Sequence, residues 1–494
     1  VCEGCGDCGT KSNCVAILPK ETILGRKRQI DQSSCNKDFS CLEGFCPSFV
    51  SVEGAIIDKT TIKNFDFSNL TIPKLPKINQ TFNLVVTGVG GTGVVTIGAL
   101  IGMAARLEGK GVGVMEMAGL AQKGGAVHIH CRIAERPEDI TAVRVSYAEA
   151  DALIGGELLV SAGDKTLSLL NRSKTMAVCA SNEANSGEFA LDRNFLLPKD
   201  DMKLALAARL EEKNLQFVDA TAIAKRFLGD TIYANVVLLG AAWQKGLIPL
   251  SMEAIKKAIW LNGTGVEGNL KAFDFGRRAI ADSEKIFGSS QSNDENLINS
   301  DDMTAVISDR KKRLKDYQND KLASKYEDLV VKVSGVDRKL GLAVAKGYYK
   351  LLAYKDEYEV ARLHVTNLKT ALSKEFKNGY KINFYFASSF MSRKKKDGEI
   401  KKIKFGSWAF YFLRVLALCR GLRGTIFDIF RYSEERIKER YLIKEYENDV
   451  SYFISIFSAR SCDLMIERAL IPLDIRGFGH VKNKSITAAS EKRK

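Results

Sequence analysis

Seven cysteines lie within the first 46 residues of this 494-residue chain, and their spacing is typical of metal ligands. Cys2, Cys5 and Cys8 follow one another at intervals of three residues in "CEGCGDCGTKSNC". In iron–sulfur proteins, three thiolates at this interval wrap a loop around a cubic cluster, and a distant cysteine followed by proline supplies the fourth ligand. Cys46, which precedes Pro47, fits that role. The spacing therefore predicts a [4Fe–4S] cluster; structural zinc sites usually pair two Cys-x2–4-Cys segments instead.

The other three cysteines of this region predict a second site with one unusual ligand. In "DQSSCNKDFSCLEGFCPSF" the three-residue interval recurs, but Asp38 stands between Cys35 and Cys41 where a cysteine is expected. The second cluster would take these three residues, with Cys14 crossing over from the first segment. A carboxylate binds iron less tightly than a thiolate, so the site is predicted to hold four irons or, with the labile one lost, three. The alternative is that Asp38 is a turn residue and no second cluster forms.

The remaining four cysteines indicate the compartment of the cell in which the protein works. Cys131, Cys179, Cys419 and Cys462 stand singly in apolar surroundings, as buried core cysteines do. Without a secretory signal or a disulfide framework, the thiols indicate the cytoplasm. No apolar run reaches the roughly 18 residues of a membrane helix, so no membrane association is expected. The chain starts at Val1, one residue before a cysteine motif, and we expect it to be the C-terminal part of a longer polypeptide.

The net charge of +15 suits nucleic acid, anionic lipid or an acidic protein partner. A zinc-knuckle protein that binds nucleic acid is one alternative, but the cysteine spacing argues against it, and we expect no nucleic acid. The basic run at 393–404 has few interleaved aromatic residues and is interpreted as a solvated surface.

A second domain is expected to begin after the proline-containing linker at 70–78. Residues 82–87 predict a buried strand, 92–107 an amphipathic helix and 111–117 a second strand. This alternation of strands and helices continues and predicts a doubly wound, Rossmann-like α/β domain over 80–285.

The turn after the first of these strands has the glycine pattern of dinucleotide-binding proteins. Gly88, Gly90 and Gly93 fall between strand and helix, and Glu116 follows at the end of the second strand. The amides of a helix N-terminus can hold a phosphate. Three interpretations stay open: a bound dinucleotide, another anionic group, or a structural turn. The first would make the chain an iron–sulfur NAD(P)-dependent reductase, which is the alternative from a different enzyme class.

Polar residues follow the second strand. Gln122 and Lys123 lie in a glycine-rich loop and are candidate cleft residues. His128 and His130 then fall on one face of the next predicted strand. Without a third metal ligand nearby, we expect them to form hydrogen bonds rather than bind metal.

The last part of the chain is expected to be mostly helical. A polar linker is predicted at 286–303, followed by a helical domain over 304–494. Predicted elements are helices at 309–330, 338–363, 409–422 and 433–457, and a short β segment at 380–389. Arg476 and His480, near the end, are expected to make contacts between domains.

The motif order resembles a known family. "CEGCGDCGTKSNC", "DQSSCNKDFSCLEGFCPSF", "GVGGTGVVTIGALI", "GLAQKGGAVHIHCRI" and "AYKDEYEVARL" together are similar to the C-terminal part of fused indolepyruvate ferredoxin oxidoreductases, members of the 2-oxoacid:ferredoxin oxidoreductases. The resemblance covers essentially the whole chain. It implies a ferredoxin-like region over 1–60 and identifies 80–285 as a gamma-type catalytic domain. The Asp38 position departs from the family's pattern.

The resemblance also implies a reaction. Thiamine diphosphate and Mg²⁺, bound by upstream domains that this sequence lacks, would decarboxylate an arylpyruvate, and coenzyme A would take the acyl group. Electrons would leave through the [4Fe–4S] clusters to an acidic ferredoxin. Gly88, Gly90, Gly93, Gln122 and Lys123 would line the cleft for substrate and coenzyme A, and a homo-oligomer is expected.

Overall fold

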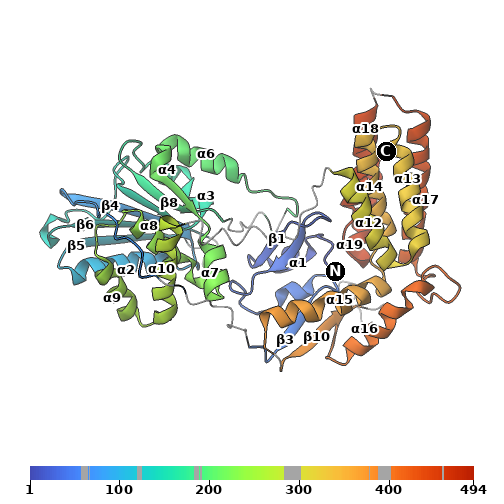
Figure 1. Ribbon diagram of the computed structural model, residues 1–494, viewed down its shortest axis with the longest axis horizontal. Coiled ribbons are helices and arrows are strands. Elements are labelled where there is room, and N and C mark those ends of the chain that lie inside the picture. Colours follow the sequence, from blue (N-terminus) through green and yellow to red (C-terminus); the bar gives the residue numbers. More distant parts are fainter. Residues whose placement is uncertain are drawn as a thin grey trace.

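The protein, seen here as a computed structural model, has two lobes (Figure 1). One lobe is the expected α/β domain, and the other combines the N-terminal cysteine region with the C-terminal helices. The structure describes residues 1–56, 65, 67–119, 125–182, 189, 192–282, 302–377, 379–387, 402–458 and 461–493.

A six-stranded sheet forms the centre of the α/β lobe. Its strands are β4 (Thr81–Val89), β5 (Gly111–Ala118), β6 (Ala126–Ala134), β7 (Ala152–Gly155), β8 (Met176–Ala180) and β9 (Leu215–Val218). Their spatial order is β5-β6-β4-β7-β8-β9. β4, β7, β8 and β9 pair in parallel, whereas β6 runs antiparallel to both of its neighbours.

Helices cover both faces of this sheet, as expected for a doubly wound domain. They are α2 (Val94–Leu107), α3 (Leu158–Ser161), α4 (Asp164–Leu167), α6 (Lys199–Arg209), α7 (Ala220–Leu228), α8 (Ala234–Gln244), α9 (Met252–Asn262) and α10 (Val266–Ala281). Alternate residues of β4 enter two separate cores: Leu84 and Val86 pack with α2 and α8, and Val85 packs with α3 and α6. Because both faces of the sheet are covered, β4 is buried nearly throughout.

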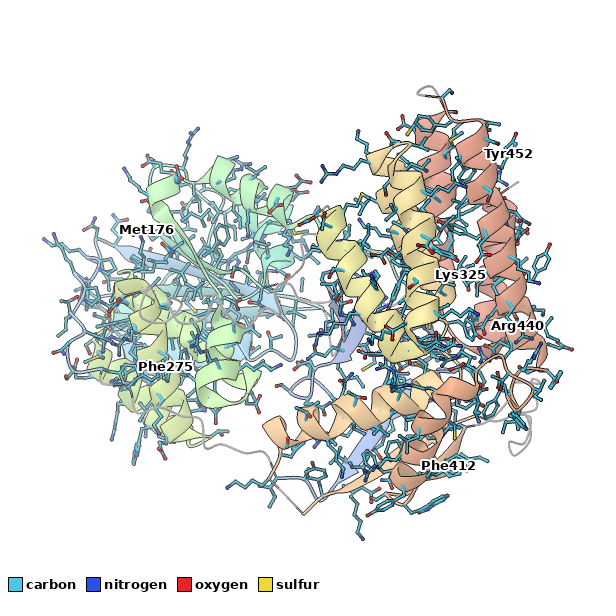
Figure 2. All side chains as sticks on the ribbon, turned by 45° about the vertical axis from the view of Figure 1, so that its right-hand side comes forward. Met176, Phe275, Lys325, Phe412, Arg440 and Tyr452 are labelled. Atoms are coloured by element: carbon cyan, nitrogen blue, oxygen red, sulfur yellow. The ribbon has the colours of Figure 1, made fainter. Side chains whose placement is uncertain are left out.

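The C-terminal part is mostly helical, as predicted. Its helices are α12 (Met303–Tyr317), α13 (Asp320–Ser334), α14 (Arg338–Leu352), α15 (Glu357–Glu375), α16 (Ala409–Leu418), α17 (Glu434–Ser455), α18 (Cys462–Leu470) and α19 (Gly479–Arg493). The rings of Tyr326, Tyr348 and Tyr446 stack in succession at 6.0 and 5.9 Å inside the bundle. In Figure 2, the labelled residues Lys325 and Tyr452 mark the positions of α13 and α17.

The helical spacing at 309–330 and 338–363 is confirmed, although it does not show where one helix ends and the next begins. Each segment contains two helices, because a polar side chain starts a new helix within it. Asn319 accepts a hydrogen bond from the amide of Leu322 (3.0 Å), and Asp356 accepts one from Glu359 (2.8 Å).

The N-terminal region shares a sheet with the C-terminal part, which was not expected from the sequence. It contains α1 (Asp7–Ser12), the antiparallel hairpin of β1 (Ile17–Lys20) and β2 (Lys27–Ile30), the 3-10 turn η1 (Ser40–Glu43) and β3 (Val50–Glu53). β3 pairs with β10 (Lys381–Phe386), which pairs with β11 (Ile403–Phe405). Figure 1 shows β3 and β10 side by side beneath the helical bundle. The described residues 1–56 therefore fold together with the C-terminal part.

The remaining expectations on segments are settled in part. The segment 70–78, predicted as a linker, packs against the α/β lobe. Gln244 donates to the carbonyl of Thr71 (2.7 Å), and Leu75 packs on the core of that lobe. Most of 286–303 and of 393–404 lies outside the described residues. Among the helices that the structure describes, none is both long and apolar enough to cross a membrane.

Candidate metal centre

The two cysteine-bearing segments of the N-terminal region meet between α1 and η1. The backbone of Gly44 packs against Cys8, so closely that a Cβ at position 44 would lie 2.8 Å from the Cα of Cys8. Asp7 supports this contact by accepting a hydrogen bond from the amide of Phe45 (2.6 Å). Cys46 follows directly and is buried, as is Cys8. The fold thus carries the distant Cys-Pro segment to the Cys-x2-Cys-x2-Cys loop.

Four thiols form the first cysteine group: Cys2, Cys5, Cys8 and Cys46. The pKa of Cys5 is raised to about 12, mainly by burial and further by the negative charges of Cys46 and Cys2. Burial is also the main cause that raises the pKa of Cys8, followed by the charge of Cys46. Cys46 itself has a raised pKa through burial and then through Cys2. The four side chains therefore lie close enough to affect one another's ionisation.

The second cysteine group is separate and consists of Cys14, Cys35, Asp38 and Cys41. The pKa of Cys41 is raised to about 11 by burial and by the charges of Cys14, Cys35 and Asp38, in that order. The two groups are the two that the sequence spacing predicts, although their role as ligand sets remains a prediction.

Asp38 has a turn role in this structure. It is exposed, and its Oδ1 accepts hydrogen bonds from the amide and the hydroxyl of Ser40 (3.1 and 3.0 Å). This contact matches the alternative in which Asp38 stabilises the turn before η1. Both of these hydrogen bonds end on Oδ1, so iron would bind Asp38 through Oδ2. The turn role and the ligand role therefore use different oxygens of the same carboxylate.

The chemistry of the first group fits an iron–sulfur cluster. Buried thiols that raise one another's pKa are poorly suited to ionise alone, whereas a cluster binds them as thiolates. The amide of Gly4 also points to Cys2 Sγ (3.3 Å), and the hydroxyl of Ser48 lies 3.0 Å from Cys46 Sγ. No group of three or more His, Cys, Asp or Glu side chains in the described residues is arranged to hold a single metal ion. A cubic cluster differs because it spreads its ligands over four separate irons.

The C-terminal part closes over the first cysteine group. Val360 of α15 and Phe478 pack against Cys46. The ring of His480 contacts that of Phe45 at a tilt of 52°, with centroids 4.9 Å apart, and a Cβ at Gly477 would lie 3.4 Å from that of Cys5. Arg476 donates to Asn194 Oδ1 in the α/β lobe (3.2 Å). The expectation that Arg476 and His480 make contacts between domains is thus confirmed.

Lysines from the C-terminal part also reach this group. Lys355 donates to the carbonyls of Val1 (2.9 Å) and Cys2 (3.0 Å) and pairs with the buried Glu3 (2.6 Å). Lys402 donates to the carbonyls of Gly44 (2.6 Å) and Cys46 (3.2 Å). Sequence reasoning missed both lysines, because nothing in their local sequence distinguishes them from the many surface lysines.

In the α/β lobe, the glycine turn connects β4 to α2 and is tightly packed. Gly93 has a positive φ of 82°, and Asn235 donates to its carbonyl (2.9 Å). The amide of Gly90 donates to the carbonyl of Gly125 (2.8 Å). A Cβ at Gly88 would lie 2.3 Å from a methyl of Val94. Packing alone therefore accounts for the glycines at 88 and 93, which fits the interpretation as a structural turn.

The strand order of the sheet differs from the one that the dinucleotide fingerprint predicts. The fingerprint requires the second strand to lie next to the first, so that its acidic residue reaches the ribose. Here β6 lies between β4 and β5, and Glu116 projects exposed from the outer strand. This order disfavours the NAD(P)-dependent alternative.

The histidine prediction is confirmed for His130, whose Nδ1 accepts a hydrogen bond from the amide of Val145 (2.9 Å). His128, two residues earlier, is half-buried on the same strand. Gln122 and Lys123 lie outside the described residues, so their role in a cleft stays a prediction.

Comparison with known proteins identifies the α/β lobe. The family model described as pyruvate ferredoxin/flavodoxin oxidoreductase matches residues 83–279. The chain is 31% identical over 204 residues to indolepyruvate oxidoreductase subunit IorB of Pyrococcus horikoshii, and the match covers 40% of this chain and 96% of that protein. The chain belongs to the 2-oxoacid:ferredoxin oxidoreductase family. The chain is also 30% identical over 204 residues to IorB of Thermococcus kodakarensis. That match covers 40% of this chain and 96% of the relative.

Other matches concern single parts of this oxidoreductase. Residues 303–494 match a family of unknown function, DUF6537. Among solved structures, the gamma subunit of the keto/oxoacid ferredoxin oxidoreductase from Geobacter sulfurreducens is 23% identical, with a TM-score of 0.29, and the match covers 40% of this chain and 98% of that one.

Proposed function

We propose that this chain is the electron-transfer and substrate-cleft portion of an indolepyruvate-type 2-oxoacid:ferredoxin oxidoreductase. The observation that carries the proposal is the grouping of Cys2, Cys5, Cys8 and Cys46 beside an α/β domain of this family. IorB, the name of the relatives, supports indolepyruvate or another arylpyruvate as the substrate.

Cys2, Cys5, Cys8 and Cys46 would hold a [4Fe–4S] cluster, and Cys14, Cys35, Asp38 and Cys41 would hold the second. Bound there, the clusters would accept and release single electrons. The chain's own contribution is to hold both ligand sets close together and to exclude water from the first. In the first group Cys8 and Cys46 are less than a tenth exposed and the other two thiols are half-buried. The second group has no buried member: its three cysteines are half-buried and Asp38 is exposed. Electrons would thus leave toward ferredoxin from the second group.

The reacting carbon chemistry would take place elsewhere. Thiamine diphosphate and Mg²⁺ would be bound by upstream domains of the same enzyme, and coenzyme A would be the co-substrate. The turn at Gly88, Gly90 and Gly93, with the loop that contains Gln122 and Lys123, would border the cleft. The packing of this turn against Asn235 makes it a rigid wall suited to that position.

Electron transfer from the isolated chain tests the proposal. The chain would be purified without oxygen, reduced, freed of excess reductant and mixed with an oxidised [4Fe–4S] ferredoxin. We expect EPR signals of reduced clusters that disappear as ferredoxin becomes reduced. Cys46→Ser should remove the signal of the first cluster, whereas Cys462→Ser, at a half-buried cysteine on α18, should leave both signals. A reduced chain that passes no electrons to ferredoxin would contradict the proposal.

A further inference from the structure

Two lysines of the C-terminal part donate hydrogen bonds to backbone carbonyls of the first cysteine group and its neighbours. Lys355 lies in the loop between α14 and α15 and bonds to the carbonyls of Val1 and Cys2. Lys402 lies directly before β11 and bonds to the carbonyls of Gly44 and Cys46. Both belong to the segment that matches only a family of unknown function.

The charges of nearby cysteines affect the pKa of both lysines. Burial lowers the pKa of Lys402, and the negative charges of Cys46, Cys41, Asp7 and Cys8, in that order, oppose that change. Lys402 therefore lies within reach of both cysteine groups, since Cys41 belongs to the second. Burial also acts on Lys355, but the charge of Glu3, followed by those of Cys2 and Cys46, raises its pKa overall.

The two lysines differ in how far their charge is already neutralised. Lys355 forms an ion pair with Glu3, whose side chain is 7% exposed and which also pairs with Lys350. Both hydrogen bonds of Lys402 end on carbonyl oxygens, and its ammonium group lies 5.1 Å from the ring centroid of Phe49. Asp7 acts on Lys402 only electrostatically, whereas Glu3 pairs directly with Lys355. The charge of Lys402 is thus the less compensated of the two, in surroundings where water screens poorly.

We propose that Lys402 is a positioning residue that raises the reduction potential of the cluster on Cys2, Cys5, Cys8 and Cys46. This inference rests on the proposed function. Reduction adds one negative charge to the cluster, and a fixed cation nearby stabilises the reduced state more than the oxidised state. Lys402 also fixes the Gly44–Cys46 loop through its two hydrogen bonds. The domain of unknown function would accordingly enclose the cluster and adjust its potential.

A redox titration followed by EPR tests this, with iron content measured in parallel. The signal of the first cluster is assigned as the one missing from Cys46→Ser. For Lys402→Met we expect full iron content and a more negative midpoint potential. The ratio of reduced to oxidised cluster at the wild-type midpoint should fall about tenfold, which is about 59 mV for one electron.

Two variants control for charge and position. Lys404→Met removes a lysine two residues away that is 52% exposed and pairs with Glu53, and it should leave the potential unchanged. Lys402→Arg keeps the charge and should keep the potential near that of the wild type. An iron-loaded Lys402→Met protein with the wild-type potential would overturn the inference.

Loss of iron has its own meaning in this experiment. If Lys402→Met cannot hold the cluster, Lys402→Arg decides: full loading supports a role for the charge, and loss of iron despite the retained charge overturns it. A wild-type chain without iron would instead contradict the proposed function, so the two failures are distinguishable.

Discussion

Gly44 and Cys8 are in direct backbone contact, although 36 positions separate them: a Cβ at position 44 would lie 2.9 Å from the amide nitrogen of Cys8. Gly44 has an ordinary φ of −60°, so its lack of a side chain serves this contact and not a strained backbone. We therefore expect Gly44→Ala to push the two cysteine segments apart. The variant should lose most of the iron of the first cluster. Gly421→Ala is the control, because open space surrounds Gly421, and it should load normally. Full iron content in Gly44→Ala would show that this contact is dispensable.

The two left-handed glycines of the β4–α2 turn separate backbone strain from crowding. Gly91 and Gly93 have φ values of 87° and 82°, but only Gly93 has a neighbour where a Cβ would lie, the amide nitrogen of Asn235 at 2.4 Å. Alanine at either position costs about 1–2 kcal/mol through the positive φ. Gly93→Ala should cost about 1–3 kcal/mol more through overpacking. Urea unfolding of both variants measures the difference, and equal losses would contradict the role given to Asn235.

The pH dependence of stability should include a contribution from His130. This side chain is 2% exposed, and burial, together with His128 and Arg144, lowers its pKa from 6.5 to about 4. Its Nδ1 accepts from the amide of Val145, so protonating that nitrogen would break the hydrogen bond. Because the unfolded chain binds the proton more tightly, the stabilisation is complete above pH 6.5. It is lost as the pH falls toward 4, by about 3 kcal/mol.

His130→Asn provides the comparison for this prediction. Asparagine can accept the same hydrogen bond but does not titrate. The free energy of unfolding, measured by denaturant at pH 7 and at pH 5, should fall less steeply with pH in the variant. Identical pH dependence in both proteins would mean that His130 does not titrate in this range.

A buried ion pair holds the turn after η5 (Cys419–Leu422) to the start of α15. Arg423 binds both carboxylate oxygens of Asp356 (2.5 and 2.8 Å), and both side chains are at most 4% exposed. Arg423→Met leaves Asp356 buried without its partner and should cost about 3–5 kcal/mol. Arg136→Met removes a solvent-exposed pair with Asp139, which water screens, and should cost far less. Thermal or urea unfolding of the two variants distinguishes these values, and similar losses would contradict the role of burial.

Local sequence patterns predicted much of this molecule. The period of apolar residues located β4, α2 and the helices of the C-terminal part, because local propensity and burial act in the same direction there. The interval between cysteines sorted eight residues into the same two groups that interact in the structure. The helices and strands depend on residues within a few positions of one another. The cysteine groups follow a known spacing, in which a distant cysteine followed by proline completes the set.

Features that depend on distant pairing could not be predicted in this way. The insertion of β6 between β4 and β5, which moves Glu116 away from the glycine turn, follows from strand order. The pairing of β3 with β10 joins segments more than 300 residues apart. Lys355 and Lys402 reach the first cysteine group only through that fold, and a lysine carries no local signal for such a contact.

The most direct test of the central claim is the amount of iron and acid-labile sulfide per chain after purification without oxygen. Two clusters predict about eight irons, or about seven if the iron beside Asp38 is lost. About four would limit the claim to the cluster on Cys2, Cys5, Cys8 and Cys46. A chain that holds zinc and no iron would contradict the account.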